Sequence, residues 1–128
     1  NFGLRSGSIA GSVAHDSHNI VAIGADDESL LQAINAVAAN RGGLVFRSAS
    51  ESLVHPLPVA GLMGTTDAWR AATAFEKLGR LAKADGCPQG SPFMTLSFLS
   101  LLVIPSLKIG DKGLFDVDSF SPIEPWEG

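Results

Sequence analysis

Residues 8–25 read SIAGSVAHDSHNIVAIGA, and this stretch decides the fold. Ser8–Ala14 alternates small polar with apolar residues, which predicts a β-strand. Asn19–Ala25 predicts a second, more buried strand. The polar residues His15–Asn19 stand between them, in the place of a hairpin loop, which commonly holds about two to five residues. The sequence therefore predicts a domain that begins with a β-hairpin whose loop is polar.

Two helices are predicted beyond this hairpin. The first is capped by Asp26 or Asp27 and ends at Gly42-Gly43. Its apolar residues form a single stripe: Leu30, Leu31, Ile34, Val37 and Ala38. The second is capped near Thr65–Asp67 and ends at Gly86. Its apolar face consists of Ala68, Ala72, Phe75, Leu78 and Ala82.

Further strands are predicted between and after the helices, at Leu44–Arg47, Leu53–Val59, Phe93–Ile104 and, as a short addition, Leu114–Val117. A turn is predicted at Asp111–Gly113. The element order is β-β-α-β-β-α-β. This order predicts an α+β fold with a mixed or antiparallel sheet of about five strands and two helices covering one face. The uncovered face would need a partner. We expect the domain to span residues 1–120 and residues 121–128 to form an irregular tail.

Composition excludes several classes of partner. The chain has 128 residues, 9 basic against 13 acidic side chains, and no cluster of Lys or Arg. This argues against nucleic acid or an anionic membrane surface as the main partner. Charged residues make up 17% of the chain, against about 25% in an average domain, so we expect some apolar surface to be covered.

The single cysteine, Cys87, excludes an internal disulfide and a Cys-rich metal site. A reducing, cytoplasmic setting is therefore expected. We expect no signal peptide, since no basic-then-apolar leader follows Asn1. The longest apolar-rich stretch, Phe93–Ile104, is shorter than the roughly 18–20 residues of a membrane helix.

The loop His15–Asn19 is the densest polar cluster in the sequence. Two histidines and a carboxylate suit a transition metal, and an Asp can also orient a His that activates a Ser. A catalytic metal needs three protein ligands, and nothing else in the chain pairs obviously with these residues. A polar hairpin whose Asp and Asn bond their own backbone is the structural alternative. No Gly-x-Ser-x-Gly motif supports a serine hydrolase.

Other candidates are weaker. His55 is expected to be solvated or partly packed, and Gly61–Gly64 lacks the lysine of a phosphate-binding loop. Cys87 has no adjacent base. Trp69 and Trp126 are candidate contacts for a neighbouring domain.

Several blocks together resemble the C-terminal domain of bacterial and archaeal adenine deaminases. They occur in order along residues 2–120: Phe2–Leu4, Ser12–Ile20, Pro56–Met63, Pro92–Leu99 and Val103–Pro105. Leu102 departs from the pattern, because proline is expected there. The tail from Ser121 onward carries no resemblance.

The resemblance implies a hydrolase of the amidohydrolase superfamily, which converts adenine and water to hypoxanthine and ammonia. In such an enzyme, Mn or Fe is bound by a β/α barrel that this chain is too short to contain, because a barrel needs roughly 200 residues or more. No metal ligand is assigned within the chain. The expected partners are the barrel domain of the same enzyme and adenine, with a homo-oligomer in the full-length form.

The resemblance also suggests roles for the polar loop, which would face the barrel mouth. His15, Asp16 and His18 are the candidate catalytic residues, and Ser17 and Asn19 the candidate substrate-binding residues. The chain alone is expected to be inactive. The alternatives are a stand-alone module that binds a purine or a protein, and a structural oligomerisation domain.

Overall fold

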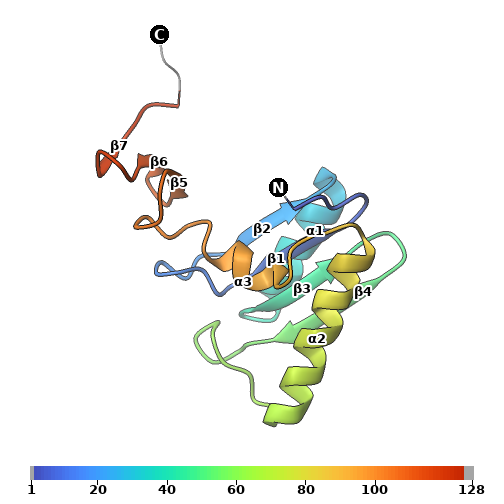
Figure 1. Cartoon of the computed structure of the whole chain (residues 1–128). Helices are drawn as coiled ribbons and strands as arrows, with labels where there is room; N and C mark the ends of the chain where they lie inside the picture. The colour runs from blue at the N-terminus through green and yellow to red at the C-terminus, as the bar shows by residue number, and fades with distance from the viewer. Residues whose placement is uncertain (1, 126–128) are drawn as a thin grey trace.

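The computed structural model describes residues 2–125, which form two antiparallel sheets and three helices (Figure 1). The elements in chain order are β1 (Ser8–Gly11), β2 (Val21–Gly24), α1 (Asp27–Ala39), β3 (Gly43–Arg47), β4 (Ser52–Pro56), α2 (Ala68–Ala84), α3 (Pro92–Ser97), β5 (Leu107–Gly110), β6 (Gly113–Asp116) and β7 (Ser121–Pro122). The predicted α+β class is confirmed.

The main sheet has the strand order β2-β1-β3-β4, and every neighbouring pair is antiparallel. The predicted opening hairpin is confirmed, since β1 pairs with β2 from Ser8 opposite Gly24 to Gly11 opposite Val21. All four residues of β1 are buried. Strand β1 is therefore the centre of the domain.

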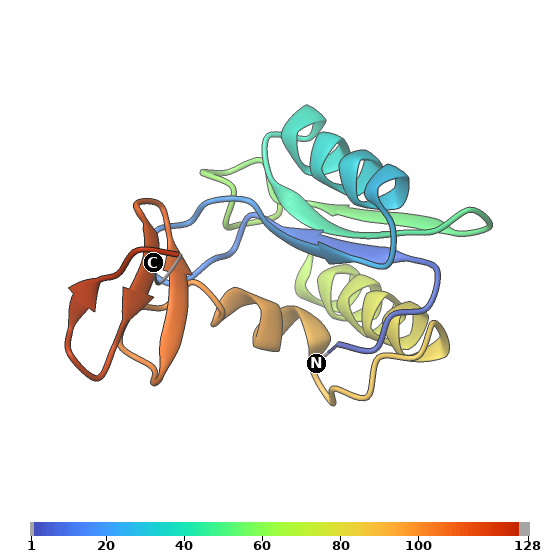
Figure 2. The same cartoon turned by 90° about the horizontal axis from the view of Figure 1, so that it is seen from above.

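Helices cover both faces of this sheet. Side chains alternate along a strand, so neighbouring residues of β1 face opposite sides. Ile9 lies in one core cluster with Leu78 of α2 and Leu96 of α3, whereas Ala10 lies in another with Val37 of α1. Figure 2 shows α1 on one side of the sheet and α2 and α3 on the other.

The prediction that two helices cover one face and leave the other for a partner is therefore wrong. Strands β1 and β3 are apolar or small on both faces, and burying both faces requires a helix layer on each side.

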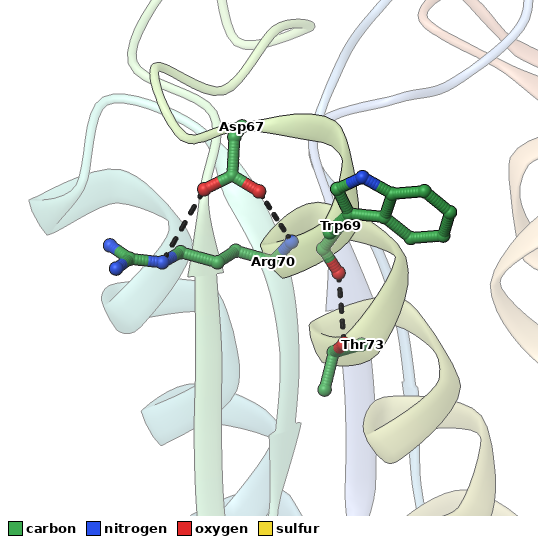
Figure 3. A network of polar contacts seen from close by, with 4 residues as sticks. All are labelled: Asp67, Trp69, Arg70 and Thr73. Carbon is green, nitrogen blue, oxygen red and sulfur yellow. Dashed lines mark hydrogen bonds and ion pairs between the residues drawn. The ribbon is translucent and has the colours of Figure 1, made fainter.

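The predicted helix caps are confirmed. Asp26 accepts a hydrogen bond from the Ser29 amide at 2.8 Å and begins α1. Asp67 accepts one from the Arg70 amide at 3.0 Å and begins α2, and its second oxygen lies 3.4 Å from Arg70 Nε (Figure 3). Such caps satisfy amides that have no partner within the helix.

The predicted strand Phe93–Ile104 is wrong, because this segment begins with helix α3. Met94, Leu96 and Phe98 alternate with polar residues, which is the strand pattern. Phe93, Leu96 and Ser97 are the residues that are buried, and their spacing is helical. Pro92 at the start of the helix fixes a helical φ and needs no amide partner. Among residues 2–125, no helix is long and apolar enough to cross a bilayer.

The last described segment folds as a second small sheet with the order β5-β6-β7. The predicted turn at Asp111–Gly113 and the predicted strand at Leu114–Val117 are confirmed as the β5–β6 hairpin. The prediction of a wholly irregular tail is wrong at Ser121–Pro122, which pair with β6. Residues 126–128 of that tail, including Trp126, lie outside the described residues.

Asp85, the C-cap residue of α2, holds the chain that leads into β1. Its carboxylate accepts hydrogen bonds from the amides of Arg5, Ser6 and Gly7 at 3.1, 3.2 and 2.9 Å, and from the Ser6 hydroxyl at 2.6 Å. Burial alone would raise the pKa of Asp85, but these hydrogen bonds outweigh it and hold the pKa below its ordinary value. The charged form is therefore the one that stabilises the fold.

Replacing Asp85 by Asn should lower the free energy of unfolding at pH 7 by about 1–3 kcal/mol, because three amides and a hydroxyl lose a charged acceptor. The folded pKa lies below the unfolded value of about 3.9, so the stabilisation is present above that pH and is lost as pH falls through the folded pKa.

Urea denaturation at several pH values measures this effect. In Asp85→Asn, the free energy of unfolding should fall less steeply as the pH is lowered. The exposed control Asp118→Asn should keep the wild-type slope, and an equal slope in both variants would contradict the role of Asp85.

Candidate functional site

The polar loop that follows β1 is anchored to the protein interior at its first residues. The Ser12 amide donates to Gly43 O at 3.1 Å, and Ser12 Oγ accepts from the Gly43 amide at 2.9 Å. Ala14 is fully buried, and the His18 amide closes a turn on Ala14 O at 2.6 Å. The loop is therefore a defined turn anchored to the main sheet.

Helix α3 supplies the other anchor. The His15 amide donates to Ser97 O at 2.9 Å, and Ser100 Oγ donates to His15 O at 3.3 Å. The His15 ring packs against Phe98 with 4.6 Å between the ring centroids. Residues far apart in sequence thus fix both the backbone and the ring of His15.

His15 carries a polar atom without a partner. Its Nδ1 is buried and has no hydrogen-bond partner among the residues that the structure describes. The His18 ring lies edge-on at a centroid distance of 6.3 Å, but His18 itself is exposed. A buried ring nitrogen without a partner costs free energy, about 1–3 kcal/mol in typical cases. This nitrogen is the buried side-chain polar atom that has no partner among the described residues.

A cleft of about 360 Å³ opens beside the loop. Its walls come from three segments: Asp16 and Ser17 of the loop, Ser100–Val103 after α3, and Gly110–Asp111 at the β5–β6 turn. Leucine and valine side chains line one part of it, while two carboxylates and two hydroxyls lie at other parts. A cleft of this size and lining suits a small, partly apolar molecule.

The structure brings together only part of the predicted site. Residues 16–19 are all exposed, and of the predicted site residues Asp16 and Ser17 line the cleft whereas His15, His18 and Asn19 do not. Ser100 and Asp111 line it and were missed from the sequence. Ser100 was assigned to a strand, and Asp111 was assigned only to a turn.

Metal binding requires more ligands than this site provides. Among the described residues, no group of three His, Cys, Asp or Glu side chains could hold a metal ion. The residues present therefore do not fit a complete metal site.

The remaining candidate residues divide into His55 and Cys87, which are buried, and Trp69, which is exposed. His55 is buried, which corrects the expectation that it is solvated or partly packed, and Cys87 is buried in the core. Trp69, in contrast, is 86% exposed on the first turn of α2, where its backbone carbonyl accepts a hydrogen bond from Thr73 Oγ1 at 2.8 Å (Figure 3).

The fold is an α+β domain with a cleft beside the loop that follows β1 and a second sheet at its side. The chain belongs to the adenine deaminase C-terminal domain family, whose model matches residues 1–121. This confirms the resemblance seen in the sequence blocks.

Curated relatives are similar along nearly the whole chain. The chain is 52% identical over 128 residues to an adenine deaminase of Methanosarcina barkeri, covering all of this chain and 23% of the relative. It is 52% identical over 124 residues to one of Methanosarcina acetivorans, and 50% identical over 121 residues to one of Borreliella burgdorferi. These matches cover 97% and 94% of this chain and 22% of each relative. The chain thus spans less than a quarter of the length of these relatives.

Replacing His15 by Phe should raise the free energy of unfolding by about 1 kcal/mol, because it removes the unpaired Nδ1 and keeps an aromatic ring against Phe98. The control His18→Phe changes an exposed ring and should stay within about 0.5 kcal/mol of wild type. Urea denaturation of the 128-residue chain measures both. A clear loss of stability in His15→Phe would mean that Nδ1 has a partner.

Proposed function

We propose that this chain is the C-terminal domain of an adenine deaminase, that it packs on a catalytic barrel, and that it lends its loop to the active site. The observation that supports this most directly is the cleft beside the loop, where Asp16 and Ser17 face Ser100 and Asp111. Membership of the adenine deaminase C-terminal domain family supports the choice of enzyme.

The chemistry of the cleft suits adenine. Adenine presents an exocyclic amine, which needs acceptors, and ring nitrogens, which need donors. In the proposal, the carboxylates of Asp16 and Asp111 accept from the amine, and the hydroxyl of Ser17 donates to a ring nitrogen. The Ser100 hydroxyl already donates to His15 O, so toward adenine it can only accept from the amine. The leucine and valine walls cover the faces of the ring.

The proposal gives His15, His18 and Asn19 supporting roles, because these residues do not line the cleft. His15 Nδ1 is buried and has no partner among residues 2–125, and the proposal is that a group from the barrel or the substrate reaches it when the two parts are packed together. His18 and Asn19 lie exposed at the outer side of the loop, where a barrel would approach.

The metal belongs to the barrel in this proposal. A bound Mn or Fe ion would supply an activated hydroxide there. The part of this chain is to bind and orient the substrate. We also propose a cytoplasmic location and a homo-oligomeric full-length form.

The proposal can be tested in a full-length chimera in which this chain replaces the matching segment of the Methanosarcina barkeri relative. Replacing Asp16 by Asn should lower kcat/KM for adenine by about 10–100-fold, because a charged acceptor is worth about 1.5–3 kcal/mol. The control Asp27→Asn, an exposed carboxylate on the first turn of α1, should leave kcat/KM unchanged. Unchanged kcat/KM in Asp16→Asn and in the double variant His15→Ala, His18→Ala would reject the active-site role of the loop.

The isolated 128-residue chain provides a second test. With adenine and Mn²⁺ or Fe²⁺ it should release no ammonia. Clear deamination would contradict the proposal that the reaction requires the metal-binding barrel. Calorimetry should detect no tight adenine binding by the chain alone. Tight binding would instead favour a stand-alone purine-binding module.

A further inference from the structure

The small sheet β5-β6-β7 lies to one side of the main body (Figures 1 and 2). The loop after β1 and the chain after α3 extend toward it, and its strands pack closely with one another. A sheet of this size needs an apolar face packed against something to be stable. Its two faces must therefore be compared.

The strand registers assign each side chain to a face, because residues directly opposite in an antiparallel pair point to the same side. Ile109 is opposite Leu114. The Ile123 amide donates to Leu114 O at 3.1 Å, which continues the β6–β7 register by one residue and sets Ile123 opposite Leu114. These three residues form an apolar row across the sheet, and Leu107 lies on the same face two residues before Ile109.

The opposite face is already partly covered. Gly110 and Phe115 lie on it, and Leu102 approaches Gly110 so closely that a Cβ there would lie 3.2 Å from Leu102 Cδ2. Phe120 packs edge-on against Phe115 with 5.2 Å between the ring centroids. The chain thus supplies its own cover for this face.

The face with the apolar row, which we call the Ile109 face (Leu107, Ile109, Leu114 and Ile123), remains open. Ile109 is 69% exposed, Leu107 is 57% exposed and Ile123 is 37% exposed. The carboxylate on this face, Asp116, is occupied by the Ser119 hydroxyl at 2.6 Å and the Asp118 amide at 3.0 Å. The face is therefore apolar, with its one charge bonded within the sheet.

We infer that the Ile109 face is the surface on which the preceding part of the full-length polypeptide docks, an inference that rests on the proposed function. The relatives that match this chain are more than four times its length, because the chain covers 22–23% of them. Gly110 and Asp111 end the same hairpin and line the candidate cleft, so a partner on this face lies next to that cleft.

A segment of the same polypeptide fits this face better than a second copy does. A stable interface between separate chains buries about 800 Å² and 20–30 residues on each side, far more than four side chains supply. A tethered partner has a high effective concentration, so a small apolar face is enough.

Hydrogen exchange tests the inference by comparing the 128-residue chain with the full-length chimera described above. Amides of β6 should exchange at least tenfold more slowly in the chimera, because docking stabilises the small sheet against local opening. Replacing Ile109 by Asp, or by the β-branched Thr, should abolish this difference. The control Leu31→Asp changes a 59% exposed leucine on α1 and should leave the difference intact.

Each outcome decides the inference. Equal exchange of β6 in the chain and in the chimera, with the chimera active on adenine, rejects docking on the Ile109 face and leaves the proposed function standing. Slow exchange in a chimera whose kcat/KM is insensitive to Asp16→Asn supports docking and rejects the role of the loop. A dimer of the isolated chain in light scattering that Ile109→Asp dissociates would identify a second copy as the occupant and overturn the inference.

Discussion

The burial of strand β1 on both faces is the constraint on which the rest of the structure depends. Ser8, Ile9, Ala10 and Gly11 have helices on either side and a strand along each edge, so each must be small or apolar. The polar member, Ser8, is satisfied because its hydroxyl lies 2.6 Å from that of Ser29 at the start of α1. A strand held this tightly leaves the sheet at one fixed place, and the polar loop begins there.

The first two-thirds of the fold could be predicted from the sequence because its signals are local. The Asp26 and Asp67 caps depend on residues within a few positions of one another, and the β1–β2 hairpin depends on one continuous stretch of sequence. The predicted apolar stripe of α1 is wrong in part, because Leu31 and Ala38 are exposed and the helix instead buries Ser29, Ala33 and Val37. The layering could not be predicted in this way. Whether two helices share a face depends on which strands lie between them, and a short strand such as β1 carries small residues that suit either environment.

The candidate site likewise combines residues that could be predicted from the sequence with residues that only folding brings to it. The loop His15–Asn19 was found because its polar residues are contiguous, whereas Ser100 and Asp111 joined it only through folding. The error over Phe93–Ile104 contributed, because a strand would have carried Ser100 away from the loop. Ser97 O at the end of α3 and Ser100 Oγ just after the helix instead bond the backbone of His15. The end of α3 and the segment that follows it therefore decide both where the loop lies and which residues line the cleft.

The two carboxylates of the cleft come from parts of the chain with very different support. Asp16 belongs to a loop bonded to the main sheet and to α3, while Asp111 belongs to the turn of a small sheet on which Leu102 packs against Gly110. The distance between the two carboxylates depends on where the small sheet lies relative to the loop. Contacts that cover the Ile109 face would therefore also fix the shape of the cleft. The two proposals are therefore linked. If a neighbouring segment covers the Ile109 face, the cleft takes its final shape only when that segment is docked.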